Sequence, residues 1–133
     1  MSLQSPHDPF LIPDMDQAVE RLHRAVTTQE PICFYGDYDV DGITATSVYL
    51  SFFGGLGAQV RAYVPHRLRE GYGLNLGAVQ RLHDEGIALL VTSDCGTTSH
   101  KEIALAARLG MDVVVTDHHQ TDEDVPPAVA VLN

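Results

Sequence analysis

Short apolar runs alternate with stretches of helical periodicity along most of this chain, and the alternation restricts its fold more than any other feature. Strands that alternate with helices form a parallel sheet with helices on both faces. We therefore predict an α/β fold, a Rossmann-like three-layer arrangement, in one domain that covers residues 1–133. The helices are expected at residues 15–29, 42–53, 76–85 and 99–109, and the strands at 31–35, 59–64, 87–93, 112–116 and 128–132. A capping box of Ser99 and Glu102 is expected to start the last helix.

The chemically unusual residues follow the expected strands directly. Three aspartates follow the strand at residues 31–35, Asp94 ends the strand at 87–93, and Asp117, His118 and His119 follow the strand at 112–116. Open parallel sheets bind their ligands at the carboxyl ends of the strands. We therefore expect three separate segments to converge at one edge of the sheet.

The charge balance narrows the kinds of partner that the chain can have. Eight Lys and Arg residues stand against 18 Asp and Glu residues, which gives a formal net charge of −10. Proteins that bind nucleic acid through phosphate contacts alone normally carry a basic surface. The balance therefore argues against a protein that binds nucleic acid over a broad surface through phosphate contacts alone, and any polyanion must be held locally.

Neither secretion nor a membrane span is indicated. The apolar stretches are short, and the first residues, MSLQSPHDPF, lack the basic and apolar regions of a secretion signal. Cys33 and Cys95, the two cysteines, have neither the spacing of a disulfide framework nor that of a zinc knuckle. We expect a cytoplasmic protein with no membrane partner, in which residues 1–3 are a cloning remnant.

Asp37, Asp39 and Asp41 alternate in the segment GDYDVDG, which in an extended conformation places three carboxylates on one face. Neighbouring carboxylates repel, so such a cluster persists only if it is protonated or holds cations, and a divalent metal is the simpler explanation. A single Asp after a strand is usually a helix N-cap, which would explain Asp41 alone but not all three. An EF-hand is excluded, because it needs Glu where Val48 stands. A haloacid-dehalogenase-like phosphatase would need its nucleophilic Asp where Gly36 stands, and it stays open as an alternative.

Asp94, His118 and His119 add oxygen and nitrogen ligands to this candidate site. Such a mixed set suits Mn, Fe, Co or Zn better than Ca or Mg alone. The candidates exceed the needs of one ion, so we predict two metal ions that share a carboxylate, for which Asp94 is the candidate. Taken alone, adjacent histidines are more often a solvated pair, but their place beside Asp117 favours ligands. We interpret Cys95 as a packed structural thiol because no base partner is evident.

Two loops are candidate contacts for a phosphate-bearing substrate. The segment SDCGTTS turns from a strand into a helix, and its N–H groups and hydroxyls suit a phosphate oxygen, although plain helix capping explains them equally well. The segment HRLREGYG places two Arg and a Tyr among glycines, where Arg would hold phosphate and Tyr would stack on a base, with a solvated loop as the alternative. The candidate substrate-binding residues are His66, Arg67, Arg69, Gly71, Tyr72, Gly73, Thr97 and Thr98.

Four segments, FYGDYDVDG, VPHRLREGYGLN, VTSDCGTTS and VVVTDHH, resemble in sequence and order the motifs of the DHH phosphoesterase superfamily. The first and last define the superfamily, and the middle two point to its RecJ branch of single-strand-specific 5′ to 3′ exonucleases. The resemblance runs from about His7 to the last residue. It implies a phosphodiesterase with two Mn²⁺ ions, Mg²⁺ being the alternative, that acts on single-stranded DNA in recombination and repair. Other repair proteins are the implied partners of the full-length chain.

The resemblance also assigns roles to individual residues. It makes Asp94 the carboxylate shared between the metals, His119 a contact to the second metal or the scissile phosphate, and Asp117 the residue that orients the two imidazoles. Arg67 and Arg69 would hold the strand or its 5′ end. The implied metal ligands are Asp37, Asp39, Asp41, Asp94, His118 and His119, and the implied catalytic residues are Asp39, Asp41, Asp94 and His119.

The chain departs from the family pattern in one large respect. The family supplies a further Asp ligand and a DHHA1-type domain that grips nucleic acid, and neither fits after Asn133, while Asp122 and Asp124 lie too early to match. We expect a partial domain with weak metal binding and feeble activity. Two alternatives stay open: a DHH enzyme that acts on short oligonucleotides or cyclic dinucleotides, and a scaffold without catalysis. The intact set of mutually repelling ligand residues argues against the scaffold.

Overall fold

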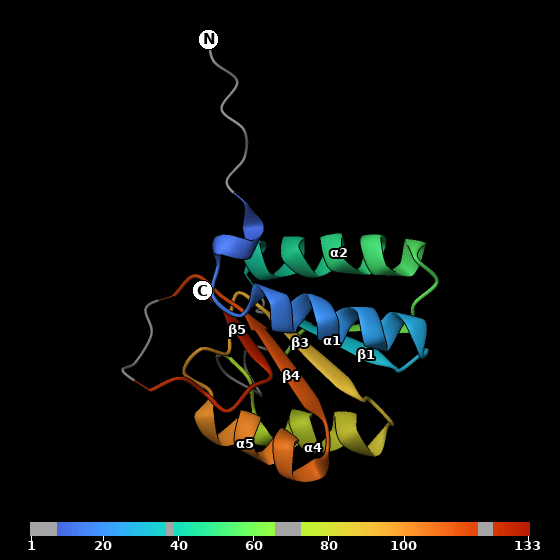
Figure 1. The fold of residues 1–133 in the computed structure, drawn as a ribbon. Helices are drawn as coiled ribbons and strands as arrows, with labels where there is room; N and C mark the ends of the chain where they lie inside the picture. Colours follow the sequence, from blue (N-terminus) through green and yellow to red (C-terminus); the bar gives the residue numbers. More distant parts are fainter. Residues whose placement is uncertain (1–7, 37–38, 66–72, 120–123) are drawn as a thin grey trace.

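The computed structural model describes residues 8–36, 39–65, 73–119 and 124–133, and it confirms the predicted α/β fold (Figure 1). Within these ranges, five parallel strands form one sheet in the order β2-β1-β3-β4-β5. No helix of the described ranges is both long enough and apolar enough to cross a membrane. The strands are β1 (Ile32–Gly36), β2 (Val60–Tyr63), β3 (Leu89–Ser93), β4 (Asp112–Thr116) and β5 (Ala130–Leu132). The helices are η1 (Pro9–Leu11), α1 (Met15–Thr27), α2 (Val40–Gly55), α4 (Leu76–Asp84) and α5 (His100–Leu109).

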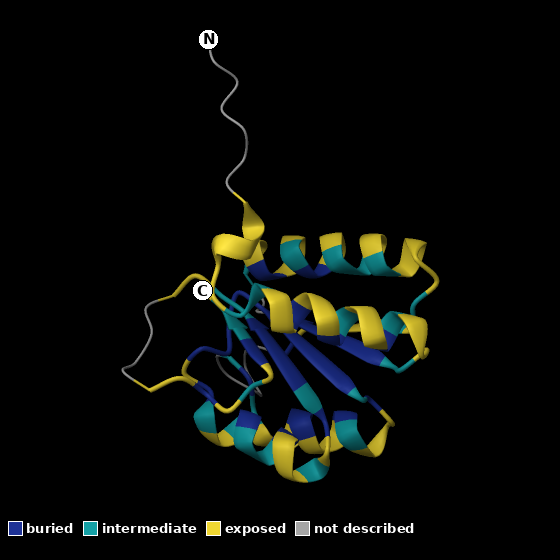
Figure 2. Ribbon diagram, viewed as in Figure 1, coloured by how far each residue is buried: buried dark blue, intermediate teal, exposed yellow. Residues whose placement is uncertain are grey.

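The helices lie in two layers, one on each face of the sheet, and the buried residues concentrate between the layers (Figure 2). Helices α4 and α5 pack against the face that carries Cys33 and Tyr35, whereas α1 and α2 pack against the face that carries Ile32 and Phe34. Side chains alternate between the two faces along a strand, so one apolar run serves both cores. All residues of β1 and β3 are buried, which explains why the central strands are nearly continuous in apolar sequence.

The strand order places a topological switch point between β1 and β3. From β1 the chain crosses to β2 on one side and then returns to β3 on the other side. Open α/β sheets hold their ligands at such a point, beyond the carboxyl ends of the strands. Gly36 pairs with Ser93, and Ser93 pairs with Thr116, so β1, β3 and β4 end level. The segments that follow these strands therefore start at the same edge.

The structure corrects the predicted capping box and several of the predicted starts of elements. Ser99 precedes α5, but its side chain makes no capping hydrogen bond, so the predicted capping box is wrong. The ψ angle of Ser99, 54°, departs from the extended backbone that lets a capping side chain turn back onto the helix. Strands β3 and β5 begin at Leu89 and Ala130, later than the predicted starts at residues 87 and 128.

At the opposite end of the sheet, Arg21 ties helix α1 to two strands. Its guanidinium makes two hydrogen bonds to Glu30, at 2.8 and 3.1 Å, and its Nε donates to Asp112 at 2.7 Å. Glu30 precedes β1 and Asp112 begins β4, so one buried cation holds the helix at the amino ends of both strands. This arrangement fixes α1 against the sheet far along the strands from the candidate site.

Candidate metal centre

Asp39 and Asp41 are placed by the start of helix α2. Asp39 is the N-cap: its backbone is extended, and its Oδ1 accepts a hydrogen bond from the Gly42 amide at 2.8 Å. Asp41 lies in the first helical turn, so the prediction of one extended segment that carries three carboxylates on a single face is wrong. The capping bond starts the helix within the motif and rotates Asp41 away from the strand direction. Asp37 lies outside the described residues.

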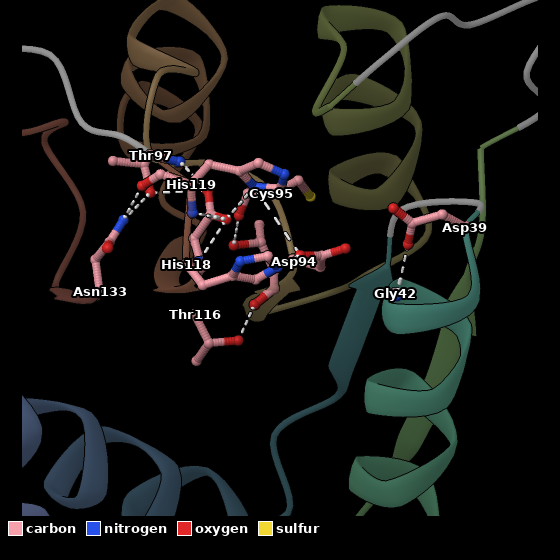
Figure 3. Close-up of polar contacts among 11 residues, drawn as sticks. Asp39, Gly42, Asp94, Cys95, Thr97, Thr116, His118, His119 and Asn133 are labelled. Carbon is pink, nitrogen blue, oxygen red and sulfur yellow. Dashed lines mark hydrogen bonds and ion pairs between the residues drawn. The ribbon is translucent and has the colours of Figure 1, made fainter.

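Asp94 lies directly after β3 at the centre of the site (Figure 3). Its backbone adopts the left-handed conformation, with φ of 61°, and its amide donates to the Thr116 carbonyl at 2.9 Å, which aligns the turn with β4. The carboxylate is buried, and among the described residues neither of its oxygens takes part in a hydrogen bond of ordinary geometry. Burial raises the pKa of Asp94, and the Asp39 carboxylate raises it further, whereas His118 acts to lower it.

His118 and His119 extend from the loop after β4 toward Asp94 (Figure 3). Nε2 of His118 is paired with Oδ1 of Asp94, and Nδ1 of His119 lies 3.9 Å from the same oxygen. The two imidazole rings are stacked, with their centroids 4.6 Å apart. One ligand atom from each of the three residues lies within 4.8 Å of the others. The structure thus brings together residues from two loops that are separated by a whole helix and strand.

Asp117 holds the two histidines in place through hydrogen bonds to their backbone and to one ring. Its Oδ1 accepts hydrogen bonds from the His118 amide at 2.8 Å, from the His119 amide at 3.2 Å and from Nδ1 of His119 at 2.6 Å. Its Oδ2 accepts from the amide and the hydroxyl of Thr97, at 3.2 and 2.8 Å. Burial acts to raise the pKa of Asp117, but the hydrogen bonds from His119 and Thr97 outweigh it and hold that pKa below its usual value. An ionised Asp117 keeps the proton of His119 on Nδ1, so Nε2 of that ring carries the lone pair.

These contacts fit a divalent transition metal. A buried carboxylate without hydrogen bonds is costly unless a cation is near it. Nε2 of His118 and Nδ1 of His119 both lie near that carboxylate, so nitrogen and oxygen atoms that can bind one cation converge there. Oxygen and imidazole ligands together suit Mn, Fe, Co or Zn. Of the described candidates, Asp94, His118 and His119 form the ligand group, and the Asp39 carboxylate acts on Asp94.

Two pockets meet at Asp94 and Asp117. The larger, of about 430 Å³, is lined by His119 together with Gly73 and residues of the loop before α5. The smaller, of about 300 Å³, is lined by His118 and Asp41. Each pocket therefore holds one imidazole, and Asp94 borders both. The two pockets thus leave space for an ion on each side of the Asp94 carboxylate.

The structure places only part of the predicted substrate contacts. Gly73, with φ of 71°, and Thr98 line the larger pocket. The Thr97 hydroxyl is engaged with Asp117, so its observed contact is with the protein itself. The residues His66, Arg67, Arg69, Gly71 and Tyr72 lie outside the described residues.

Sequence reasoning missed two residues that support the site. The Tyr35 hydroxyl donates to the Gly73 carbonyl at 3.0 Å and so holds the end of the glycine-rich loop against β1. Asn133 donates to the Thr97 hydroxyl and to the His119 carbonyl. Both contacts join segments far apart in the chain, and no local pattern signals them. The tyrosine could have been found only by asking where a buried hydroxyl finds its partner.

Comparison with known proteins identifies the family. Residues 31–133 match the DHH family, N-terminal domain. The single-stranded-DNA-specific exonuclease RecJ of Bacillus subtilis is 41% identical over 127 residues, a match that covers 96% of this chain and 16% of that protein. A crystal structure of exonuclease RecJ bound to manganese superposes with a TM-score of 0.86 at 36% identity, covering 95% of this chain and 32% of that one. RecJ in complex with Mn²⁺ from Thermus thermophilus gives 0.81 at 30% identity, over 96% and 18% of the two chains.

The chain belongs to the DHH family. It spans about a sixth of the length of the Bacillus subtilis relative that it matches.

Proposed function

We propose that this chain is the metal-binding part of a manganese-dependent phosphodiesterase that degrades single-stranded DNA from the 5′ end. The single observation that carries the proposal is the buried Asp94 carboxylate, which lacks ordinary hydrogen bonds and faces two imidazoles. The likeness to RecJ proteins, two of them solved with manganese, supports both the metal and the substrate. Mg²⁺ is the alternative metal.

In this proposal the chain holds two metal ions around Asp94. Asp41 and His118 would serve the smaller pocket and His119 the larger one, where it contacts the second ion or the scissile phosphate. Asp117 holds the His119 ring through Nδ1, which leaves the lone pair of Nε2 available for a ligand. When bound, a pair of divalent ions clamps the phosphate and lowers the pKa of a water. The proposed ligands are Asp37, Asp39, Asp41, Asp94, His118 and His119.

The substrate would be held locally, because the chain as a whole repels polyanions. With a net charge of −10, binding of DNA along a broad surface of the chain is disfavoured. Arg67 and Arg69 are the proposed contacts to the phosphates, since a guanidinium binds phosphate through two parallel hydrogen bonds. Gly73, at the end of the same segment, lines the larger pocket and so places that segment's end beside His119. We place the reaction in the cytoplasm, with other repair proteins as partners of the longer protein.

Metal binding is the first test. Isothermal titration with Mn²⁺ is compared for the wild-type chain, for Asp94→Asn and for Glu102→Gln. The carboxylate of Glu102 lines the same pocket but lies outside the ligand group, which makes it the matched control. We expect weak binding that Asp94→Asn reduces by about tenfold or more and Glu102→Gln leaves within about twofold. Equal binding by all three proteins would remove the basis of the proposal.

Substrate choice is the second test. The same proteins are incubated with Mn²⁺ and a 5′-phosphorylated single strand, the same strand in a duplex, or a cyclic dinucleotide. We expect slow release of nucleotides from the single strand, abolished by Asp94→Asn and absent with the duplex. Faster hydrolysis of the cyclic dinucleotide would instead favour an enzyme of small phosphoesters. Metal binding without hydrolysis of any substrate would show that this part of the protein binds the metal but does not suffice for catalysis.

A further inference from the structure

We propose that Asn133 is a positioning residue that fixes the proton and the orientation of the His119 imidazole through Thr97 and Asp117. The inference deepens the proposed function, because it concerns how one imidazole of the metal centre is held. Its evidence is a continuous set of hydrogen bonds that joins the ends of three parallel strands.

The side-chain amide of Asn133 is matched to two acceptors. Its Nδ2 donates to the His119 carbonyl at 2.9 Å and to Oγ1 of Thr97 at 3.1 Å. An amide NH₂ group has two protons to donate and accepts none, so both protons are used here. One bond holds the backbone of the histidine loop, and the other holds the hydroxyl that supports Asp117 (Figure 3).

The direction of these bonds orders the rest of the network. Because Nδ2 can only donate, the Thr97 hydroxyl must accept from it and direct its single proton elsewhere. That proton goes to Oδ2 of Asp117, 2.8 Å away. Oδ1 of the same carboxylate accepts from Nδ1 of His119 at 2.6 Å. The Asn133 amide thus favours the ionised state of Asp117, in which both carboxylate oxygens accept hydrogen bonds. This state keeps the proton of the His119 imidazole on Nδ1.

The sheet places Asn133 where it can do this. Leu132, at the end of β5, pairs with Thr116 of β4, and its carbonyl accepts from the Asp117 amide at 3.0 Å. The next residue therefore emerges beside the histidine loop and opposite the turn that carries Thr97. Its side chain joins the segments that follow β3 and β4 at the point where β5 ends.

Asn133 is exposed, so a purely structural role predicts small effects when it is changed. Its hydrogen bond to the His119 carbonyl is exposed and contributes little to stability, because water replaces it, and its bond to Thr97 is only partly buried. A positioning role predicts something different, namely a change in which nitrogen of His119 carries the proton. The two roles are therefore separable by a measurement on the ring itself.

The test is nitrogen NMR of the histidine side chains in the metal-free chain at about pH 8, where an ordinary imidazole is neutral. The His119 signals are assigned by their loss in His119→Gln. We expect the wild-type ring to carry its proton on Nδ1, and both Asn133→Ala and the isosteric Asn133→Asp to show a mixture of the two tautomers. Thermal unfolding of each variant, expected within a few degrees of the wild type, shows that the fold is retained.

Two further measurements complete the test. Thr97→Val should reproduce the mixed tautomers, Thr97→Ser should restore the wild-type ring, and Asn133→Ala combined with Thr97→Val should be no worse than Thr97→Val alone. The Mn²⁺ affinity of Asn133→Ala should fall about three- to tenfold, below the loss typical of residues that touch a ligand directly. An unchanged ring in both Asn133 variants, or a wild-type ring protonated on Nε2, would overturn the inference. The NMR result needs neither metal nor DNA, so it stands apart from the test of the nuclease.

Discussion

Replacing Gly36 by Ala is expected to damage both stability and metal binding. Gly36 ends β1, on the side of the strand that faces the start of α2. A Cβ atom there would lie 2.1 Å from Oγ1 of Thr46 and 2.7 Å from the Gly42 carbonyl oxygen, both closer than the 3.0 Å that real Cβ atoms keep. Thr46 already donates to that carbonyl at 2.8 Å, so the two obstacles are tied together. The first turn of α2 must therefore move as a unit.

The size of the effect follows from what must move. Overpacking of a well-packed core costs about 1 to 3 kcal/mol, and we expect the upper half of that range because one of the obstacles is backbone. For a domain of this size the loss corresponds to a melting temperature lower by about 6 to 12 °C. The Gly42 amide binds Asp39, so a displaced turn also carries the acidic residues away from Asp94. The Mn²⁺ affinity should fall by about tenfold.

Thermal unfolding and Mn²⁺ titration of Gly36→Ala and Gly55→Ala form the assay. Gly55 lies at the end of α2, where an added Cβ would meet no atom within 4 Å, so its replacement should leave stability unchanged or slightly higher. Adding Thr46→Ala to Gly36→Ala removes the side-chain obstacle but not the carbonyl, and should restore only part of the lost stability. Equal melting temperatures for the two glycine variants would refute the reasoning.

Three further predictions concern other groups. Hydrogen bonds hold the folded pKa of Asp117 below its usual value, so its ionised carboxylate stabilises the fold above about pH 4, and this stabilisation is lost as the pH falls through the folded pKa. The unfolding free energies of the wild type and of Asp117→Asn should therefore converge as the pH is lowered. A difference that stays constant with pH would contradict this. Arg21→Met removes the buried cation that Glu30 and Asp112 share and leaves them only the exposed Arg24. It should cost about 2 kcal/mol in urea unfolding, and a neutral result would speak against the role of that ion pair. Burial raises the pKa of the Cys33 thiol to about 12. In a Cys95→Ser variant, a thiol reagent should therefore label Cys33 only as fast as the chain unfolds. Labelling at the rate of a free thiol would show the reasoning wrong.

The sequence predicted the fold well because the fold rests on local patterns. The strand Asp112–Thr116 was located to the residue, since its apolar run is bounded on both sides by polar residues. The meeting of Asp94 with His118 and His119 was predictable because parallel strands end at one edge. The capping role of Asp39 was not predictable, since any of three neighbouring aspartates could have preceded the helix. The role of Asn133 could not be predicted from the sequence, because its hydrogen-bond partners, Thr97 and His119, lie 36 and 14 residues away.

The backbone at Asp94 has a consequence for selection under heat. A side chain in the left-handed region is strained by about 1 kcal/mol or more, and glycine would relieve that strain together with the repulsion around a buried carboxylate. Laboratory evolution that rewards only heat resistance should therefore find Asp94→Gly early. The surviving variants would be more stable to heat but would lack the carboxylate proposed to bind the metal, because stability and chemistry place opposite demands on this position.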